Sequence, residues 1–208
     1  MSRSLTATEA STSATVAEAA DSTKALRALY YARFGFAVVW AILMMAVATT
    51  IGPATIALLV IYPLFDVAAA VIDFRSSGTG HPKAQQNSNR RNNLHLGLYI
   101  NMGLSLLTAI ALPLAVTAGI SGALRVWGAW AITAGIVQLI VAILRYRLGG
   151  QWAMILSGGI SVLAGGSFIV MAGGPDASLT SVAGYAILGG IFFLISAIRL
   201  HRLAAKTK

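Results

Sequence analysis

The chain has 208 residues, of which 57% are hydrophobic and only 10% are charged, whereas a soluble domain carries about 25% charged residues. Its net charge is +9, but the basic residues stand next to long apolar runs. This pattern favours membrane topology and anionic lipid headgroups over nucleic acid as the reason for the charge. The chain contains no Cys, which excludes disulfides, thiolate catalysis and Cys-ligated metal.

The N-terminal segment, residues 1–30, is rich in Ser, Thr and Ala and contains Glu9, Glu18 and Asp21. It lacks the apolar core of a classical signal peptide, so targeting is expected to come from the first membrane helix. The composition predicts a disordered cytoplasmic tail, with a surface helix that leads into the membrane as the alternative.

An all-α, polytopic membrane domain is predicted over residues 31–203, with six transmembrane helices arranged as three helical hairpins. A polar cytoplasmic loop without regular structure is expected between the first two hairpins, over 76–93, and a basic tail over 204–208. Pro113 lies inside the third span, where a kink is expected rather than a break. The spans are expected at 33–51, 54–74, 94–117, 123–144, 151–172 and 178–200, which gives hairpins 33–75, 94–147 and 151–202.

An internal repeat supports the three hairpins. Residues 130–143 and 185–198 are identical at eight of fourteen positions when shifted by 55. The same shift relates Gly103 to Gly158, and a shift of 68 relates Gly35 to Gly103. Aromatic residues at 62, 130 and 185 follow both shifts, so one register fits all three hairpins.

The Lys and Arg residues predict the orientation of the chain. Fourteen of the fifteen fall on the side that holds both termini, the second loop and the fourth loop, and only Arg125 falls on the other side. Because positive residues are retained in the cytoplasm, both termini are predicted to be cytoplasmic.

The chain resembles the HdeD-type family of bacterial acid-resistance membrane proteins. The resemblance covers about residues 33–202 and rests on Arg33 with Gly35, on YPLFDVAAAVIDFR, on RYRLGGQW followed by LSGGISVLAGG, and on GYAILGGIFFLISAIR. The chain departs from the family pattern at Val67, where the family has glycine, and in its long 76–93 loop. The resemblance implies three two-helix repeats in an inner-membrane protein linked to stress or low-pH survival, without a settled biochemical activity.

Asp66 is the candidate for a functional side chain, because it lies deep in the second span, where an ionised carboxylate costs about 2.5 kcal/mol or more. No basic residue is expected at its depth, so the carboxyl group must be protonated, hydrogen-bonded or hydrated by a cavity. The predicted buried polar cluster joins it to Asn101, Gln138 and Ser157. This cluster either fixes helix packing or senses protons or a solute. A separate interfacial ion pair is predicted between Arg33 and Asp73.

Glycines inside the spans lower helix propensity and are expected to let helices approach closely. The predicted packing positions are Gly35, Gly103, Gly135, Gly158, Gly165 and Gly190. The three histidines share no ligand spacing with a carboxylate, so no metal site and no cofactor are predicted.

The sequence thus predicts a structural or stress-protective membrane protein without catalytic activity. The alternative is a small-solute or proton-linked transporter or channel that uses the Asp66 cluster. The predicted partners are the lipid bilayer and anionic headgroups on the cytoplasmic side. A homo-oligomer is compatible with the pattern, and the sequence does not decide the oligomeric state.

Overall fold

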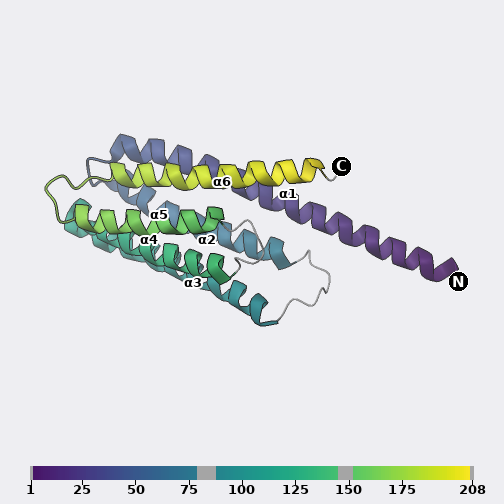
Figure 1. Ribbon diagram of the computed structural model, residues 1–208. Helices are drawn as coiled ribbons and strands as arrows, with labels where there is room; N and C mark the ends of the chain where they lie inside the picture. The colour runs from purple at the N-terminus through teal and green to yellow at the C-terminus, as the bar shows by residue number, and fades with distance from the viewer. Residues whose placement is uncertain (1, 79–87, 145–151, 207–208) are drawn as a thin grey trace.

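The computed structural model describes residues 2–78, 88–144 and 152–206, and these residues form helices joined by short turns (Figure 1). No strand occurs within these ranges. The helices are α1 (Ser2–Val47), α2 (Pro53–Gly78), α3 (Ser88–Ala115), the 3₁₀-helix η1 (Val116–Ala118), α4 (Gly119–Leu144), α5 (Trp152–Met171) and α6 (Thr180–Lys206).

The ends of the helices follow from local sequence. The Gly52 carbonyl accepts the Ile56 N–H at 3.0 Å at the start of α2, and Pro53, which has no N–H, takes the first helical position. Between α3 and α4, Gly119 adopts φ +73°, which permits the reversal of direction that η1 begins. The helix α3 continues through Pro113, as expected for a proline in an apolar helix.

Two boundaries differ from the predicted ones. The N-terminal segment is helical from Ser2 onward, as part of α1. Its backbone therefore agrees with the helix that was the alternative and not with a disordered tail. The polar loop is shorter than 76–93, because α2 extends to Gly78 and α3 begins at Ser88. Helices can lengthen in this way because adding a residue to an existing helix is easier than starting one. The rest of that loop, 79–87, lies outside the described residues.

The helices lie along a common direction and form one bundle (Figure 1). The extensive contacts are between α4 and α5, between α1 and α6, and between α2 and α3, whereas α5 and α6 touch little although they are consecutive. The turns 48–52, 116–118 and 172–179 lie at the same end of the bundle, and the N-terminal part of α1 projects beyond the other end.

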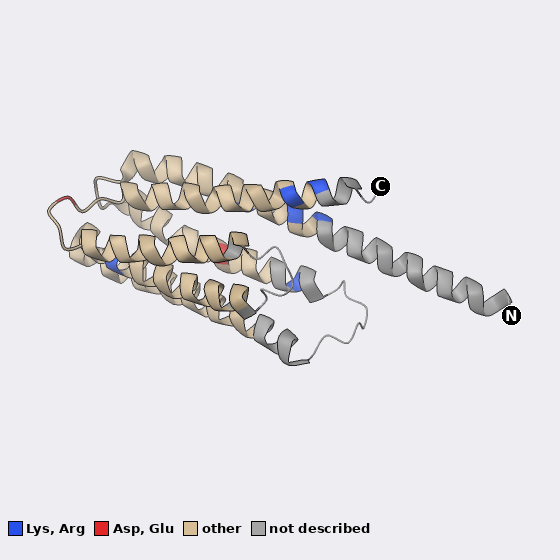
Figure 2. Ribbon diagram, in the orientation of Figure 1, with Lys and Arg blue, Asp and Glu red and all other residues tan. Residues whose placement is uncertain are grey.

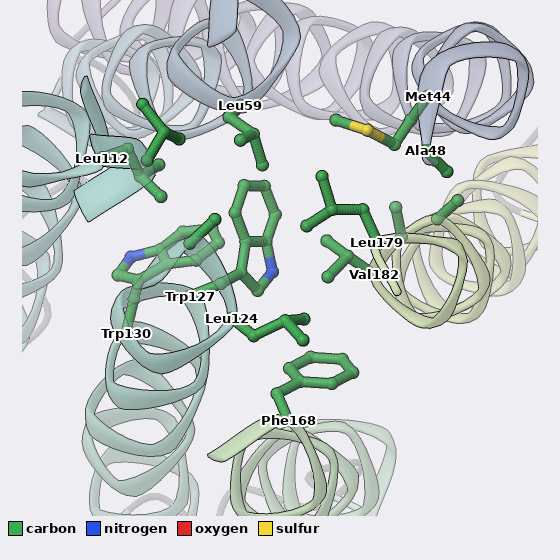
Figure 3. Packing of buried hydrophobic residues seen from close by; sticks show 14 of the residues in the cluster. Met44, Ala48, Leu59, Leu112, Leu124, Trp127, Trp130, Phe168, Leu179 and Val182 are labelled. Atoms are coloured by element: carbon green, nitrogen blue, oxygen red, sulfur yellow. The ribbon is translucent and has the colours of Figure 1, made fainter. Parts of the chain in front are cut away.

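The apolar core lies in the half of the bundle near these turns. Trp127 stands at its centre, fully buried among Leu59, Leu124 and Leu179 (Figure 3). The indole ring of Trp40 stacks on that of Trp127 at 5.5 Å between centroids. Aromatic rings bury large areas and fix the distance between helices, so this cluster holds α1, α2 and α4 together.

Large apolar side chains also cover the outside of the bundle. Leu163 keeps 76% of its surface exposed and Val170 keeps 79%. Four stretches of the described chain are long and apolar enough to cross a membrane: Lys24–Val47, Pro53–Ile72, Leu96–Ile140 and Thr180–Arg202. A fifth apolar helix, Ile155–Met171, is shorter. The exposed apolar surface and these lengths are those of a helical membrane protein.

Candidate functional site

Asp66 lies on α2, about 20 Å along the helix axis from Pro53. Each of its carboxylate oxygens is hydrogen-bonded. Arg33 on α1 donates from Nη2 to Oδ1 at 3.0 Å. Asn101 and Ser105 on α3 both donate to Oδ2, from Nδ2 and Oγ, at 2.8 Å each. The carboxylate therefore joins three helices and carries its counter-charge beside it.

The ion pair with Arg33 corrects the expectation that no basic residue lies at the depth of Asp66. Arg33 is 14 residues before the end of α1 at Val47, which places it about 20 Å from that end, as Asp66 is from Pro53. The prediction took Arg33 as the first residue of the span, but α1 runs without interruption through this position. Arg33 is thus inside the apolar part of the helix.

The Arg33 guanidinium is held from a second side as well. Its Cζ lies 4.7 Å from the centre of the Phe193 ring on α6, a cation–π contact. Its Nε is buried and has no hydrogen-bond partner among the described residues. Arg33 therefore links α1 to both α2 and α6.

Trp130 extends the network to α4. Its indole Nε1 donates to Ser105 Oγ at 3.1 Å, and Ser105 is fully buried. The serine hydroxyl accepts a hydrogen bond from the indole and donates one to Asp66, so both its acceptor and its donor are used. We call Arg33, Asp66, Asn101, Ser105 and Trp130 the Asp66 cluster. With the Phe193 contact it connects α1, α2, α3, α4 and α6.

The structure brings together two of the four residues predicted for the cluster, Asp66 and Asn101. Gln138 lies on α4 and Ser157 on α5, both half-buried, and neither is among the described partners of Asp66. Equal depth was the basis for including them, but depth does not tell which way a helix face points.

For the predicted ion pair of Arg33 with Asp73, the side chain of Asp73 lies outside the described residues, and the described carboxylate partner of Arg33 is Asp66. The sequence reasoning missed Ser105 and Trp130. One signal could have found Ser105, because it follows Asn101 by four residues and so lies on the same helix face.

The predicted packing glycines divide into two groups. An added Cβ at Gly135 would come within 2.8 Å of the Gly158 carbonyl oxygen, and one at Gly165 within 2.5 Å of the Gly128 carbonyl oxygen. These two pairs, seven residues apart on each helix, let α4 and α5 meet backbone to backbone. Gly190 is also close, at 3.1 Å from Ala37 Cβ on α1.

Gly35 and Gly103 do not act in this way, since an added Cβ at either would meet nothing within 4 Å. Neither position is therefore at a close contact between the described helices. They share the repeat register of Gly158, but register fixes only the position along a helix, and the side chains of the neighbouring helix decide whether a gap is left. Gly128, which was not predicted, belongs to the contact.

Three further buried polar side chains make no described hydrogen bond to the cluster. Tyr185 donates its hydroxyl to Ser161 Oγ at 2.9 Å, and Trp40 donates Nε1 to the Leu58 carbonyl at 2.7 Å. The Trp127 indole nitrogen is buried without a partner among the described residues. Within the described part of the chain, no three His, Cys, Asp or Glu side chains are grouped so that they could hold a metal ion.

The Asp66 cluster therefore joins helices through an ion pair and hydrogen bonds, and we call this arrangement the polar clasp. A carboxylate with a guanidinium and two neutral donors is well compensated, and each charge-assisted bond is roughly twice as strong as a neutral one. The side chains of Arg33 and Asp66 nevertheless keep 17% and 21% of their surface exposed. No protein-family model, curated protein or solved structure matches this chain.

Proposed function

We propose that the chain is a six-span membrane protein made of three repeated helical hairpins, closed in a cyclic order. The stretch Leu96–Ile140 counts as two spans, because 45 residues of helix would be about 68 Å long, twice the thickness of the hydrocarbon core. In this arrangement the second helix of each hairpin packs on the first helix of the next. The contacts of α2 with α3, α4 with α5 and α6 with α1 support this order.

The contact positions support the repeat as well. Gly135 on α4 faces Gly158 and Ser161 on α5. Gly190 on α6 faces α1 at residues 34–37. The repeat shift of 55 relates Gly135 to Gly190. Two of the three cyclic contacts therefore use a small residue at the same place in the repeat.

At the third contact, between α2 and α3, the place of this glycine is taken by Val67. The preceding residue, Asp66, bonds to Asn101 and Ser105, which lie on either side of Gly103 in the repeat register. A polar clasp thus replaces glycine packing at one of three equivalent contacts. We infer that the cluster has the same task as the glycines, which is to join consecutive hairpins.

The proposed location is the bacterial plasma membrane with both termini in the cytoplasm. Most of the described Lys and Arg residues lie toward one end of the bundle (Figure 2), whereas Arg125 is near the turns and Arg33 lies inside the apolar part of α1. This distribution agrees with the bias of positive residues toward the cytoplasm.

The proposed function is structural and stress-protective, of the HdeD type and without catalysis, with protection at low pH as the expected role. The observation that carries the structural part is that both carboxylate oxygens of Asp66 accept hydrogen bonds, from Arg33, Asn101 and Ser105. Three donors to one carboxylate, one of them a cation, make the arrangement expected of a group that joins helices. The stress-protective part rests on the resemblance to the HdeD-type family.

The exposed fraction of the ion pair favours a second candidate, a proton-linked or small-solute transporter, because 17% of Arg33 and 21% of Asp66 remain accessible. Reconstituted vesicles that contain a pH-sensitive dye would distinguish the two. The structural proposal predicts no proton flux above that of empty vesicles. A flux that Asp66→Asn abolishes at an equal amount of folded protein would establish the transporter.

Stress protection itself is tested in cells. A deletion strain should survive low pH less well than the same strain with the gene restored, and both should grow alike at neutral pH. Equal survival of the two strains would contradict the stress-protective role. It would not affect the structural role of the Asp66 cluster, which is tested separately by unfolding measurements.

A further inference from the structure

One face of α6 changes from apolar to cationic as the helix reaches its C-terminal end. Ile195, Ile198, Arg199 and Arg202 stand at intervals of three, one and three residues, which places them on one side of a helix. All four are exposed, with 52% of the surface of Ile195 and 38% of that of Ile198 accessible. This face is directed away from the rest of the bundle.

A second set of cations, on α1, meets this end of α6. The Nη1 of Arg27 lies 3.4 Å from Nδ1 of His201. Lys24 precedes Arg27 by one turn of α1. Figure 2 shows the Lys and Arg residues of α1 and α6 gathered where the two helices lie side by side. We call Arg27, Arg199, His201 and Arg202 the α1–α6 basic patch.

The described acidic side chains do not neutralise this patch. Asp66 is bound to Arg33. Asp176 lies in the turn between α5 and α6, at the other end of the bundle (Figure 2). Among the described side chains, the patch therefore has an excess of positive charge.

The depth of the patch indicates the kind of partner. Arg27 is 20 residues from Val47, and Arg199 is 19 residues from Thr180. At 1.5 Å per residue both lie about 30 Å from the opposite end of their helices, which is the thickness of the hydrocarbon core. The patch is thus at the level of lipid headgroups on the side proposed to be cytoplasmic.

We propose that the outer face of α6 binds an anionic phospholipid, with the phosphate on Arg199 and Arg202 and an acyl chain along Ile195 and Ile198. Arginine suits this role, because its planar group of N–H donors matches phosphate oxygens. A free anion would use only the cations, whereas the continuous apolar surface below them matches a lipid.

This inference rests on the proposed membrane embedding but not on stress protection, so the two can fail separately. The test uses the full chain, purified in a mild detergent, with phosphatidylglycerol or phosphatidylcholine added and lipid retention measured by native mass spectrometry. The wild type should retain phosphatidylglycerol preferentially. The Arg199→Gln/Arg202→Gln variant should lose roughly fivefold to thirtyfold of that affinity, since each cation near an anionic surface contributes about a factor of five.

Arg125→Gln is the matched control, because it removes one exposed cation at the opposite end. It should retain the lipid like the wild type. An equal loss in Arg125→Gln, or no loss in the double variant, would overturn the proposal. So would displacement of the lipid by millimolar inorganic phosphate, which would identify a free anion as the ligand. If the double variant does not fold, Arg202→Gln alone applies the same test with the loss expected for one cation, about fivefold.

Discussion

Removing Asp66 from its ion pair with Arg33 should cost more stability than removing Arg33. Asp66→Asn leaves the guanidinium of Arg33 in an apolar environment without a counter-charge, and arginine cannot lose its proton there. Arg33→Gln leaves a carboxyl group, which can bind a proton and become neutral. We therefore expect Asp66→Asn to destabilise the protein more than Arg33→Gln.

The magnitude follows from the geometry. Two unit charges about 4 Å apart interact by about 4 kcal/mol at an effective dielectric constant near 20. Breaking a buried pair costs about 3–5 kcal/mol, and the 17% and 21% exposure of these side chains reduces that figure. We expect a loss of about 2–3 kcal/mol for Asp66→Asn and about 1–2 kcal/mol for Arg33→Gln. The double variant should lose less than the sum, with a coupling of about 1–3 kcal/mol.

The free energy of unfolding is measured by SDS titration of the purified protein in mixed micelles, followed by tryptophan fluorescence. Arg125→Gln and Asp176→Asn form the matched control, because both are exposed and lie at the other end of the bundle. Each of these two variants should change the free energy of unfolding by no more than about 0.5 kcal/mol, and their effects should be additive in the double variant. Additivity within about 0.5 kcal/mol for Arg33 and Asp66 as well would refute the clasp.

Three further outcomes are expected. Gly165→Leu should lower the folded yield in detergent strongly, because its Cβ would meet a backbone oxygen at 2.5 Å. Gly166→Leu should fold like the wild type, because a Cβ there meets nothing within 4 Å. Equal yields of the two variants would contradict the backbone contact of α4 and α5. Ser105→Ala should destabilise the protein by about 1–3 kcal/mol in the same titration, since a buried donor loses its partner, and no loss would remove the serine from the cluster. Single cysteines at Gly52 and Gly174 should react with impermeant reagents only from outside, and labelling from the cytoplasm would reverse the proposed orientation.

The apolar helices were predictable because hydropathy depends on composition along the chain, and membrane helices need long apolar runs. Asp66 was predictable as a site for the same reason, since an acidic residue inside such a run needs an explanation. Its pairing with Asn101 was proposed from depth alone and agrees with the hydrogen bond at 2.8 Å.

The rest of the cluster depends on information that one sequence does not carry. Gln138 and Ser157 have a suitable depth but lie on other helices than the partners of Asp66. Arg33 was missed because a basic residue beside an apolar run is usually read as the end of the membrane. A long arginine side chain can instead extend along the helix to a carboxylate, and Phe193 supports it there. Which helix packs beside which is decided by tertiary structure.

The most direct test of the central claim exchanges the two charges. In Arg33→Asp/Asp66→Arg the ion pair between α1 and α2 is kept in reverse, and the oxygens of Asn101 and Ser105 can accept from the new guanidinium. The measurement is survival of a deletion strain at low pH when it carries this variant at wild-type abundance. The structural account predicts survival equal to that of the wild type. Loss of protection at normal abundance would show that a carboxylate is needed on α2 itself, which contradicts the clasp.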